Sequence, residues 1–182
     1  PALVSLIAAW CTQLRDSSVA SAPHVPPPPK PFRLLDLPHL FQDLFHQFAK
    51  AKCGTCFQTP RTPALCLLCG AVVCANEPCC KRKDMGECFL HTIKCGAGAG
   101  MFLMLKTSSV VLLRDERLAI WGSPYLDSHG EEDLWLERGR PLYLDKSIYA
   151  HLARLLLDHR MDAEMMRSGV PNEKRIRRTR QW

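Results

Sequence analysis

The stretch that decides the fold is CGTCFQTPRTPALCLLCGAVVCANEPCCKRKDMGECFLHTIKC, residues 53–95, which holds nine of the ten cysteines of this 182-residue chain. Its cysteines recur as C-x-x-C pairs, and a histidine completes a later pair as C-x-x-H. Thiols and an imidazole at such spacing are typical of structural zinc sites, in which four ligands surround the ion tetrahedrally. A disulfide framework gives no reason for a histidine at that position, so the spacing predicts zinc.

Two ways of combining the ligands are open. In a cross-brace, alternate pairs share an ion, and this gives one site from Cys53, Cys56, Cys74 and either Cys79 or Cys80, and a second site from Cys66, Cys69, Cys88 and His91. In a ribbon, the first two pairs share one ion, and its ligands are Cys53, Cys56, Cys66 and Cys69. The cross-brace uses four ligand pairs in sequence order, so we prefer it.

The clearest single knuckle is CLLCG at residues 66–70, where glycine follows the second cysteine. Glycine lets the backbone turn tightly beneath the metal. Cys95 and the unused member of Cys79 and Cys80 are left over, and we interpret them as buried thiols, because free cysteine packs as a small hydrophobe. Cys11 is interpreted as structural or incidental.

Three segments precede the cysteine stretch. Apolar residues at helical spacing predict a helix at residues 1–15 that belongs to a preceding helical region. Residues 16–35 contain VPPPPKP and predict an extended proline-rich linker. Residues 36–52 predict an amphipathic helix with Asp36 as its N-cap and a phenylalanine- and leucine-rich face.

The sequence after the cysteines predicts a small antiparallel sheet and a helix at residues 96–162. Three apolar runs, MFLML, SVVLLR and RLAIWG, lie at hairpin distance from one another, and their unbroken apolarity predicts that both faces of the sheet are covered. Asp145 then caps a helix with a buried stripe that includes Leu152 and Leu155. Residues 163–182 form a basic tail. The expected fold class is therefore α+β, with a cross-brace-like zinc module, a β-meander, a C-terminal helix and flanking N-terminal helices.

The charge of the chain is unevenly placed. Its formal net charge is +6, but the segment from Glu173 to Trp182 alone holds five basic residues and one acid. This distribution excludes a uniformly basic nucleic-acid-binding surface, so we expect no nucleic-acid partner. The apolar opening PALVSLIAAW is about ten residues long, against the roughly twenty of a spanning helix, so we expect no membrane partner.

Motifs for catalysis are incomplete. A zinc deaminase needs H-x-E together with its P-C-x-x-C motif, and only PCC is present. His129, Glu131 and Asp133 resemble an acid–base group, but no nucleophile lies near them in sequence, and a solvated turn explains them more simply. We expect no active site within this segment.

Several quoted motifs together resemble a known family. KCGTCFQTPRTPALCLLCGAVVCANEPCC, ECFLHTIKCGAGAGMFLML and IWGSPYLDSHGEEDLWLERGRPLYL are similar to the C-terminal domain of the UBR-box N-recognins, the large ubiquitin ligases of the N-degron pathway. The likeness runs from about Leu37 to Arg160 and favours the branch of the plant arginine-type N-recognin and its animal relative. It implies as zinc ligands Cys53, Cys56, Cys66, Cys69, Cys74, Cys79, Cys80, Cys88 and His91.

The resemblance also implies a function. The parent protein would be a RING-type ubiquitin-protein ligase of the cytoplasm, with the nucleus as a second compartment. It would mark N-degron substrates for proteasomal degradation, with a ubiquitin-conjugating enzyme as a further partner. This segment would be its zinc scaffold or cap, packed on the upstream helical cap and RING domains. The alternative is a RING-like module that itself binds the conjugating enzyme, although C-x-x-C stands where a RING usually has C-x-H.

Overall fold

The computed structural model describes residues 2–16, 33–82, 85–115 and 117–168. The chain divides into two units, 1–31 and 32–182. Most of the expected proline linker and the end of the basic tail lie outside the described residues. None of the helices in the described ranges has the length and apolarity needed to cross a bilayer.

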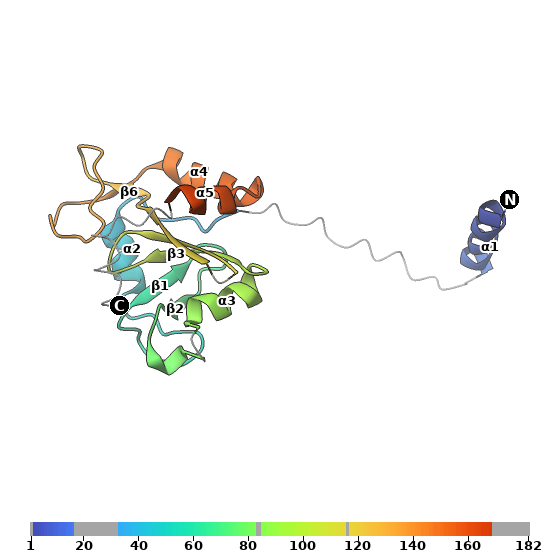
Figure 1. Cartoon of the computed structure of the whole chain (residues 1–182), viewed down its shortest axis with the longest axis horizontal. Helices are drawn as coiled ribbons and strands as arrows, with labels where there is room; N and C mark the ends of the chain where they lie inside the picture. Colours follow the sequence, from blue (N-terminus) through green and yellow to red (C-terminus); the bar gives the residue numbers. More distant parts are fainter. Residues whose placement is uncertain (1, 17–32, 83–84, 116, 169–182) are drawn as a thin grey trace. The chain divides into compact units, whose positions relative to one another are not determined.

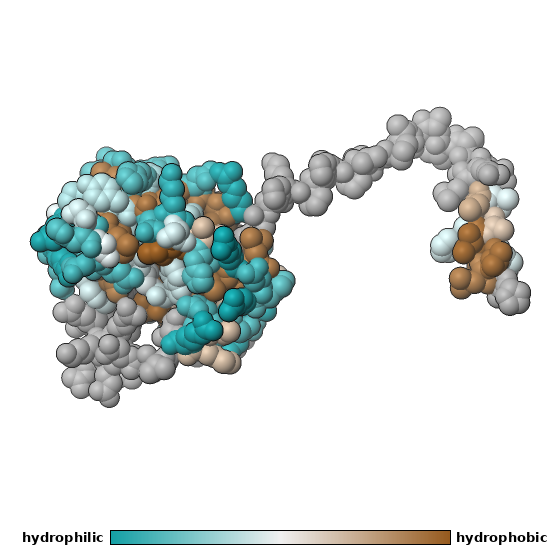
Figure 2. Space-filling view, turned by 90° about the horizontal axis from the view of Figure 1, so that it is seen from above, coloured by the Kyte–Doolittle hydropathy of each residue, from teal (hydrophilic) through white to brown (hydrophobic). Residues whose placement is uncertain are grey.

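The first unit contains the expected N-terminal helix, α1 (Ala2–Asp16). Its apolar side chains are exposed, among them Leu3, Ile7 and Trp10, and Trp10 is 67% accessible to solvent. Figure 2 shows this helix as largely apolar surface. That the apolar stripe packs on a preceding helical region stays a prediction.

The second unit is built on a five-stranded antiparallel sheet with strand order β2-β1-β3-β4-β5 (Figure 1). The expected meander is confirmed as β3 (Ala99–Met104), β4 (Val110–Arg114) and β5 (Arg117–Gly122). The sequence did not predict that the cysteine stretch adds two further strands, β1 (Pro63–Cys66) and β2 (Val72–Cys74). β1 pairs with β2 on one side and with β3 on the other. The cysteine-rich stretch is therefore continuous with the main sheet.

The sheet separates two cores, as the unbroken apolar runs predicted. Because side chains alternate along a strand, Met101 and Leu103 of β3 face one core while Phe102 and Met104 face the other. The first core is completed by α4 (Lys146–Leu157) and α5 (Met161–Ser168), and the second by α3 (Glu87–Cys95). Figure 1 shows α4 and α5 on one side of the sheet and α3 on the other.

The helix expected at residues 36–52 is shorter than predicted. α2 covers only Phe41–Phe48, and its N-cap is Leu40, so the prediction of Asp36 as the cap is wrong. The preceding residues are extended because they pair with β7 (Tyr143–Leu144): the N–H of Leu144 donates to the carbonyl of His39 at 2.8 Å. Asp36 instead pairs with Arg33. Tertiary pairing thus overrides a local capping signal.

The predicted cap at Asp145 is confirmed, because its carboxylate accepts from the N–H groups of Ser147 and Ile148. The helix that it begins ends at Leu157, and α5 follows where the sequence placed the end of the domain and the start of the tail. His159 lies in the left-handed region, with φ of 53°, and this separates the two helices. Met161 and Met165 of α5 are buried in the first core, and Arg117 of β5 adds an ion pair with Asp162 at 2.6 Å.

Candidate metal centres

The first candidate centre joins a knuckle, the end of a strand and a short turn. Its four thiols lie within 4.8 Å of one another, and they are Cys53, Cys56, Cys74 and Cys80. The knuckle is closed by the N–H of Phe57, which donates to the carbonyl of Cys53 at 3.0 Å. Cys74 ends β2, and Cys80 ends the 3₁₀ turn η1 (Pro78–Cys80). The centre therefore joins residues up to 27 positions apart.

The sulfur spacing fits zinc. Tetrahedral thiolates at a Zn–S distance of about 2.3 Å lie about 3.8 Å apart. Cys53 and Cys80 sulfurs are 3.7 Å apart, and those of Cys56 and Cys74 are 3.8 Å apart. All ten cysteines lie within the described residues and all are free, so the disulfide alternative fails.

The second candidate centre consists of Cys66, Cys69, His91 and Cys95, whose ligand atoms also lie within 4.8 Å of one another. The Cys69 sulfur is 3.2 Å from Nε2 of His91, and the Cys66 and Cys95 sulfurs are 4.0 Å apart. Gly70 has φ of 77°, as the sequence predicted for the residue beneath the metal, and its N–H donates to the carbonyl of Cys66 at 2.8 Å.

The structure places Cys95, and not Cys88, beside the other three residues of the second centre. Cys88, His91 and Cys95 share one face of α3, because residues three, four and seven apart lie on the same side of a helix. The ring of His91 packs edge-on against Phe102 of β3, at 5.9 Å between centroids. Cys88, one turn earlier, is buried in the second core. The sequence analysis counted Cys95 among the spare thiols, because the C-x-x-H spacing favoured Cys88 as the partner of His91.

The two centres interleave along the chain. The pair Cys53 and Cys56 and the pair Cys66 and Cys69 belong to different groups, so the ribbon arrangement does not fit the structure. The buried carboxylate of Glu87, at the start of α3, accepts from the hydroxyl of Thr55 in the first knuckle. The helix that supplies the second centre is thereby tied to the loop of the first.

Electrostatics favour metal binding over bare thiolates. Burial raises the pKa of the Cys66 thiol to about 12, and it also raises the pKa values of Cys74 and Cys80. The N–H of Gln58 has the opposite effect and lowers the pKa of Cys56 to about 7. Burial lowers the pKa of His91, which keeps its imidazole neutral and able to coordinate. A cation would complete each group by displacing the thiol protons.

A third group, Cys74, Glu77 and Cys79, was missed by the sequence analysis because Glu77 has no pattern of its own. The Glu77 carboxylate is already engaged: it accepts from the N–H of Thr62 at 2.8 Å and from the hydroxyl of Thr62 at 3.3 Å. Glu77 thereby holds the turn η1 against the loop that precedes β1. Cys79 is exposed and lies 3.8 Å from Cys74.

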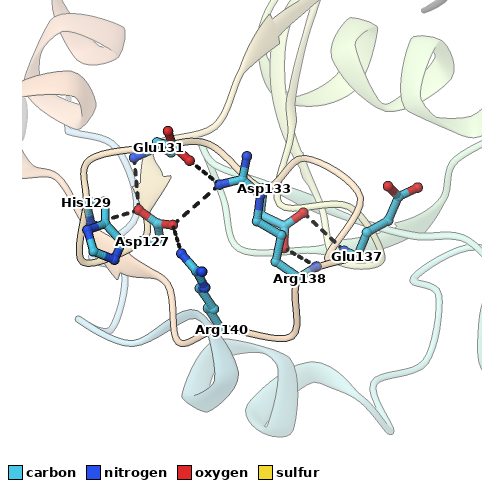
Figure 3. A network of polar contacts seen from close by, with 7 residues as sticks. All are labelled: Asp127, His129, Glu131, Asp133, Glu137, Arg138 and Arg140. Carbon is cyan, nitrogen blue, oxygen red and sulfur yellow. Dashed lines mark hydrogen bonds and ion pairs between the residues drawn. The ribbon is translucent and has the colours of Figure 1, made fainter.

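The suspected acid–base group is a structured loop (Figure 3). Asp127 accepts from the N–H groups of His129 and Glu131 at 2.8 and 3.0 Å, and it lies 3.4 Å from Arg140. Asp133 accepts likewise from the N–H groups of residues 137 and 138. His129 and Glu131 are exposed, as expected for a solvated turn, but Asp133 is buried, so that interpretation is wrong for Asp133. Asp127, which the sequence analysis did not single out, is buried as well. The oxygens of both aspartates bond to the loop that they organise.

An apolar cavity of about 260 Å³ lies next to the first centre. Its floor is the sheet face on the side of α3, and its lining includes Phe89, Phe102, Val111, Leu113, Leu118 and Trp135. Leu118 of β5 is 55% exposed at the rim. The zinc-module side of the sheet is therefore only partly covered.

Comparison with known proteins identifies relatives of this chain. Residues 1–158 match the family model described as Proteolysis_6 C-terminal. E3 ubiquitin-protein ligase ubr3 of Danio rerio is 45% identical over 130 residues, which are 71% of this chain and 7% of that protein. E3 ubiquitin-protein ligase PRT6 of Arabidopsis thaliana is 42% identical over 137 residues, 74% of this chain and 7% of the relative.

A more distant relative matches a longer part of the chain. E3 ubiquitin-protein ligase ubr1 of Schizosaccharomyces pombe is 32% identical over 158 residues, 84% of this chain and 8% of that protein. The chain thus spans less than a tenth of the length of these relatives. The likenesses confirm the resemblance that the cysteine and aromatic motifs indicated. This chain belongs to the Proteolysis_6 C-terminal family.

Proposed function

We propose that this chain is the zinc-stabilised scaffold domain of a ubiquitin ligase. The observation that carries the proposal is the interleaving of two four-ligand groups across residues 53–95, a stretch in which β1 also belongs to the main sheet. Zinc would supply a structural cross-link, since each four-ligand group satisfies a tetrahedral ion without a further position for water. Each centre would cross-link the ends of β1 and β2 to loops and helices that lie apart in sequence.

The relatives support a proposal for the parent protein. Three E3 ubiquitin-protein ligases share 32 to 45% identity with this chain. We propose a parent ligase of the RING type that acts in the N-degron pathway, in the cytoplasm and nucleus, with its substrate and conjugating-enzyme contacts made elsewhere in the protein. The residues described here would contribute shape and stability and no bond chemistry.

The apolar cavity beside the first centre is the proposed contact to the rest of the ligase. Its lining is aliphatic and aromatic, and the exposed Leu118 extends it to the surface. More than nine-tenths of the length of each relative lies outside the region that matches. A parent protein of that length would contain many other segments that could bind in the cavity. We propose as occupant a segment of the parent with a large apolar side chain, which would fill the cavity by burial of apolar area.

The test is hydrogen exchange of the same residues in two proteins: the 182-residue chain alone and the intact parent ligase. We expect amides of residues 118–120 and 134–135 to exchange more slowly in the parent, because the docked segment covers them. In the parent, Leu118→Glu should abolish this protection. Leu157→Glu is the matched control, since Leu157 is 51% exposed on α4 and does not line the cavity. Equal exchange in the two proteins would exclude docking at this cavity.

One observation favours the RING-like alternative: the ligands of the two centres interleave along the chain. It is tested by mixing the zinc-loaded chain with ubiquitin-charged conjugating enzymes and following the release of ubiquitin to free lysine. The scaffold role predicts release at the background rate. Faster release that disappears on mutation of Phe57, which is 73% exposed in the first knuckle, would favour the alternative.

A further inference from the structure

The first centre has one sulfur more than a tetrahedral ion can take. Besides its four thiols, the Cys79 sulfur lies 3.8 Å from each of the sulfurs of Cys56, Cys74 and Cys80. These distances equal the spacing of about 3.8 Å expected between thiolates on one zinc ion. Cys79 is therefore as well placed for coordination as the four residues of the group.

Two sets of four sulfurs satisfy the same geometry. Both contain Cys56, Cys74 and Cys80, and the fourth member is Cys53 in one set and Cys79 in the other. The two candidates differ in accessibility: Cys53 is fully buried, whereas Cys79 is exposed. The chain thus offers an inner and an outer thiol for one ligand position.

The geometry points to Cys79 as an exchange ligand, which can replace Cys53 at the first zinc ion. This inference rests on the zinc centre proposed above. In the exchange, the Cys79 thiol loses its proton to solvent and binds the ion, while the Cys53 thiolate leaves the ion and takes up a proton. Four thiolates bind the ion before and after, and the total charge is unchanged.

Local structure allows either state. Cys79 and Cys80 are neighbours in the turn η1, and Glu77 holds this turn through its bonds to Thr62. On the other side, the N–H of Thr55 lies 3.4 Å from the Cys53 sulfur and the N–H of Cys53 donates to the carbonyl of Gln58 at 2.9 Å. The knuckle therefore keeps its shape through main-chain bonds, whichever thiol is bound.

The test counts zinc ions per chain by native mass spectrometry. The wild-type chain should hold two ions, and Cys53→Ser and Cys79→Ser should each still hold two. The double variant should hold one, as should Cys56→Ser alone, because Cys56 belongs to both sets. Loss of an ion from either the Cys53 or the Cys79 single variant would overturn the exchange, and so would two ions in the double variant. Fewer than two ions in the wild type would instead refute the proposed centres.

A second readout reports on the state of the Cys79 thiol itself. Iodoacetamide should modify Cys79 in the wild-type chain without loss of zinc, since Cys53 completes the site. In Cys53→Ser, Cys79 should become protected because it is then a ligand. Cys11, exposed on α1, is the internal reference and should react equally in both proteins. Equal modification of Cys79 in both would contradict the inference.

Discussion

Two loop-rich regions of this molecule are held together by different chemistry. Residues 53–95 converge on two groups of thiol and imidazole ligands that an ion would complete. Residues 127–140 are organised by Asp127 and Asp133, whose carboxylates accept hydrogen bonds from main-chain N–H groups of the same loop. The first region offers ligands to an ion from outside the chain, whereas the carboxylates of the second bond to main-chain groups of their own loop. Two loop regions of the same domain can therefore be well ordered through entirely different interactions.

Removal of zinc should show the largest difference between the regions. Structural zinc contributes about 10–16 kcal/mol per site in small zinc-finger peptides, compared with a total stability of about 5–15 kcal/mol for a typical domain. We expect a chelator to abolish hydrogen-exchange protection in residues 53–95, while residues 127–140 keep part of theirs. Equal loss in the two regions would show that they do not differ in their dependence on metal.

A pair of variants on α3 sharpens the ligand assignment within the first region. Cys95→Ser should remove one zinc ion, because its sulfur belongs to the second group. Cys88→Ser should keep both ions and cost about 1–3 kcal/mol of unfolding free energy, since it places a hydroxyl at a buried position. Zinc counting by mass spectrometry and urea unfolding measure the two effects. The reverse result would restore the assignment expected from C-x-x-H spacing.

In the second region, Asp133→Ala should lower the unfolding free energy by about 3 kcal/mol. The change leaves two main-chain N–H groups without their charged acceptor. Zinc content should stay at the wild-type value, which separates this loss from damage to the metal centres. Ser128→Ala, at an exposed position of the same loop, is the control and should unfold like the wild type.

The smallest expected effect concerns pH: the contribution of Asp127 to stability should not change between pH 8 and 5. The N–H of Glu131 is the main cause that holds the pKa of Asp127 below its usual 3.8. A lowered pKa in the folded state gives stability that is present above 3.8 and is lost only as the pH falls through the lowered value. The stability difference between wild type and Asp127→Asn should therefore stay constant from pH 8 to 5. Zinc retention should decline over the same range, because its ligands bind protons.

Sequence patterns predicted the features that depend on neighbouring residues. The Asp145 cap and the turn at Gly70 each follow from a short motif, and both are present. The unbroken apolar runs of β3 and β4 predicted a sheet covered on both faces, and the structure has a core on each side, although the side of α3 is only partly covered. These features need only local geometry and apolar periodicity, which a single sequence carries.

Features that depend on tertiary placement could not be predicted in this way. Cys88, His91 and Cys95 share one helix face, so only the position of α3 relative to the CLLCG knuckle selects Cys95. The start of α2 was misplaced for a similar reason, because Leu40 is drawn into a β-bridge with Tyr143. The sequence shows that one of Cys79 and Cys80 is in excess, but only the structure places both sulfurs within reach of the first centre.

The pairing of β1 with β3 has a consequence for cells short of zinc. If β1 departed together with the cysteine-rich stretch, β3 would keep β4 but lose its other partner, and it would expose the main-chain groups of Phe102–Met104, an apolar run without a charge or proline. Bare strands of this kind recruit other chains and seed aggregation. Metal supply would then decide whether the domain persists in solution or joins insoluble deposits.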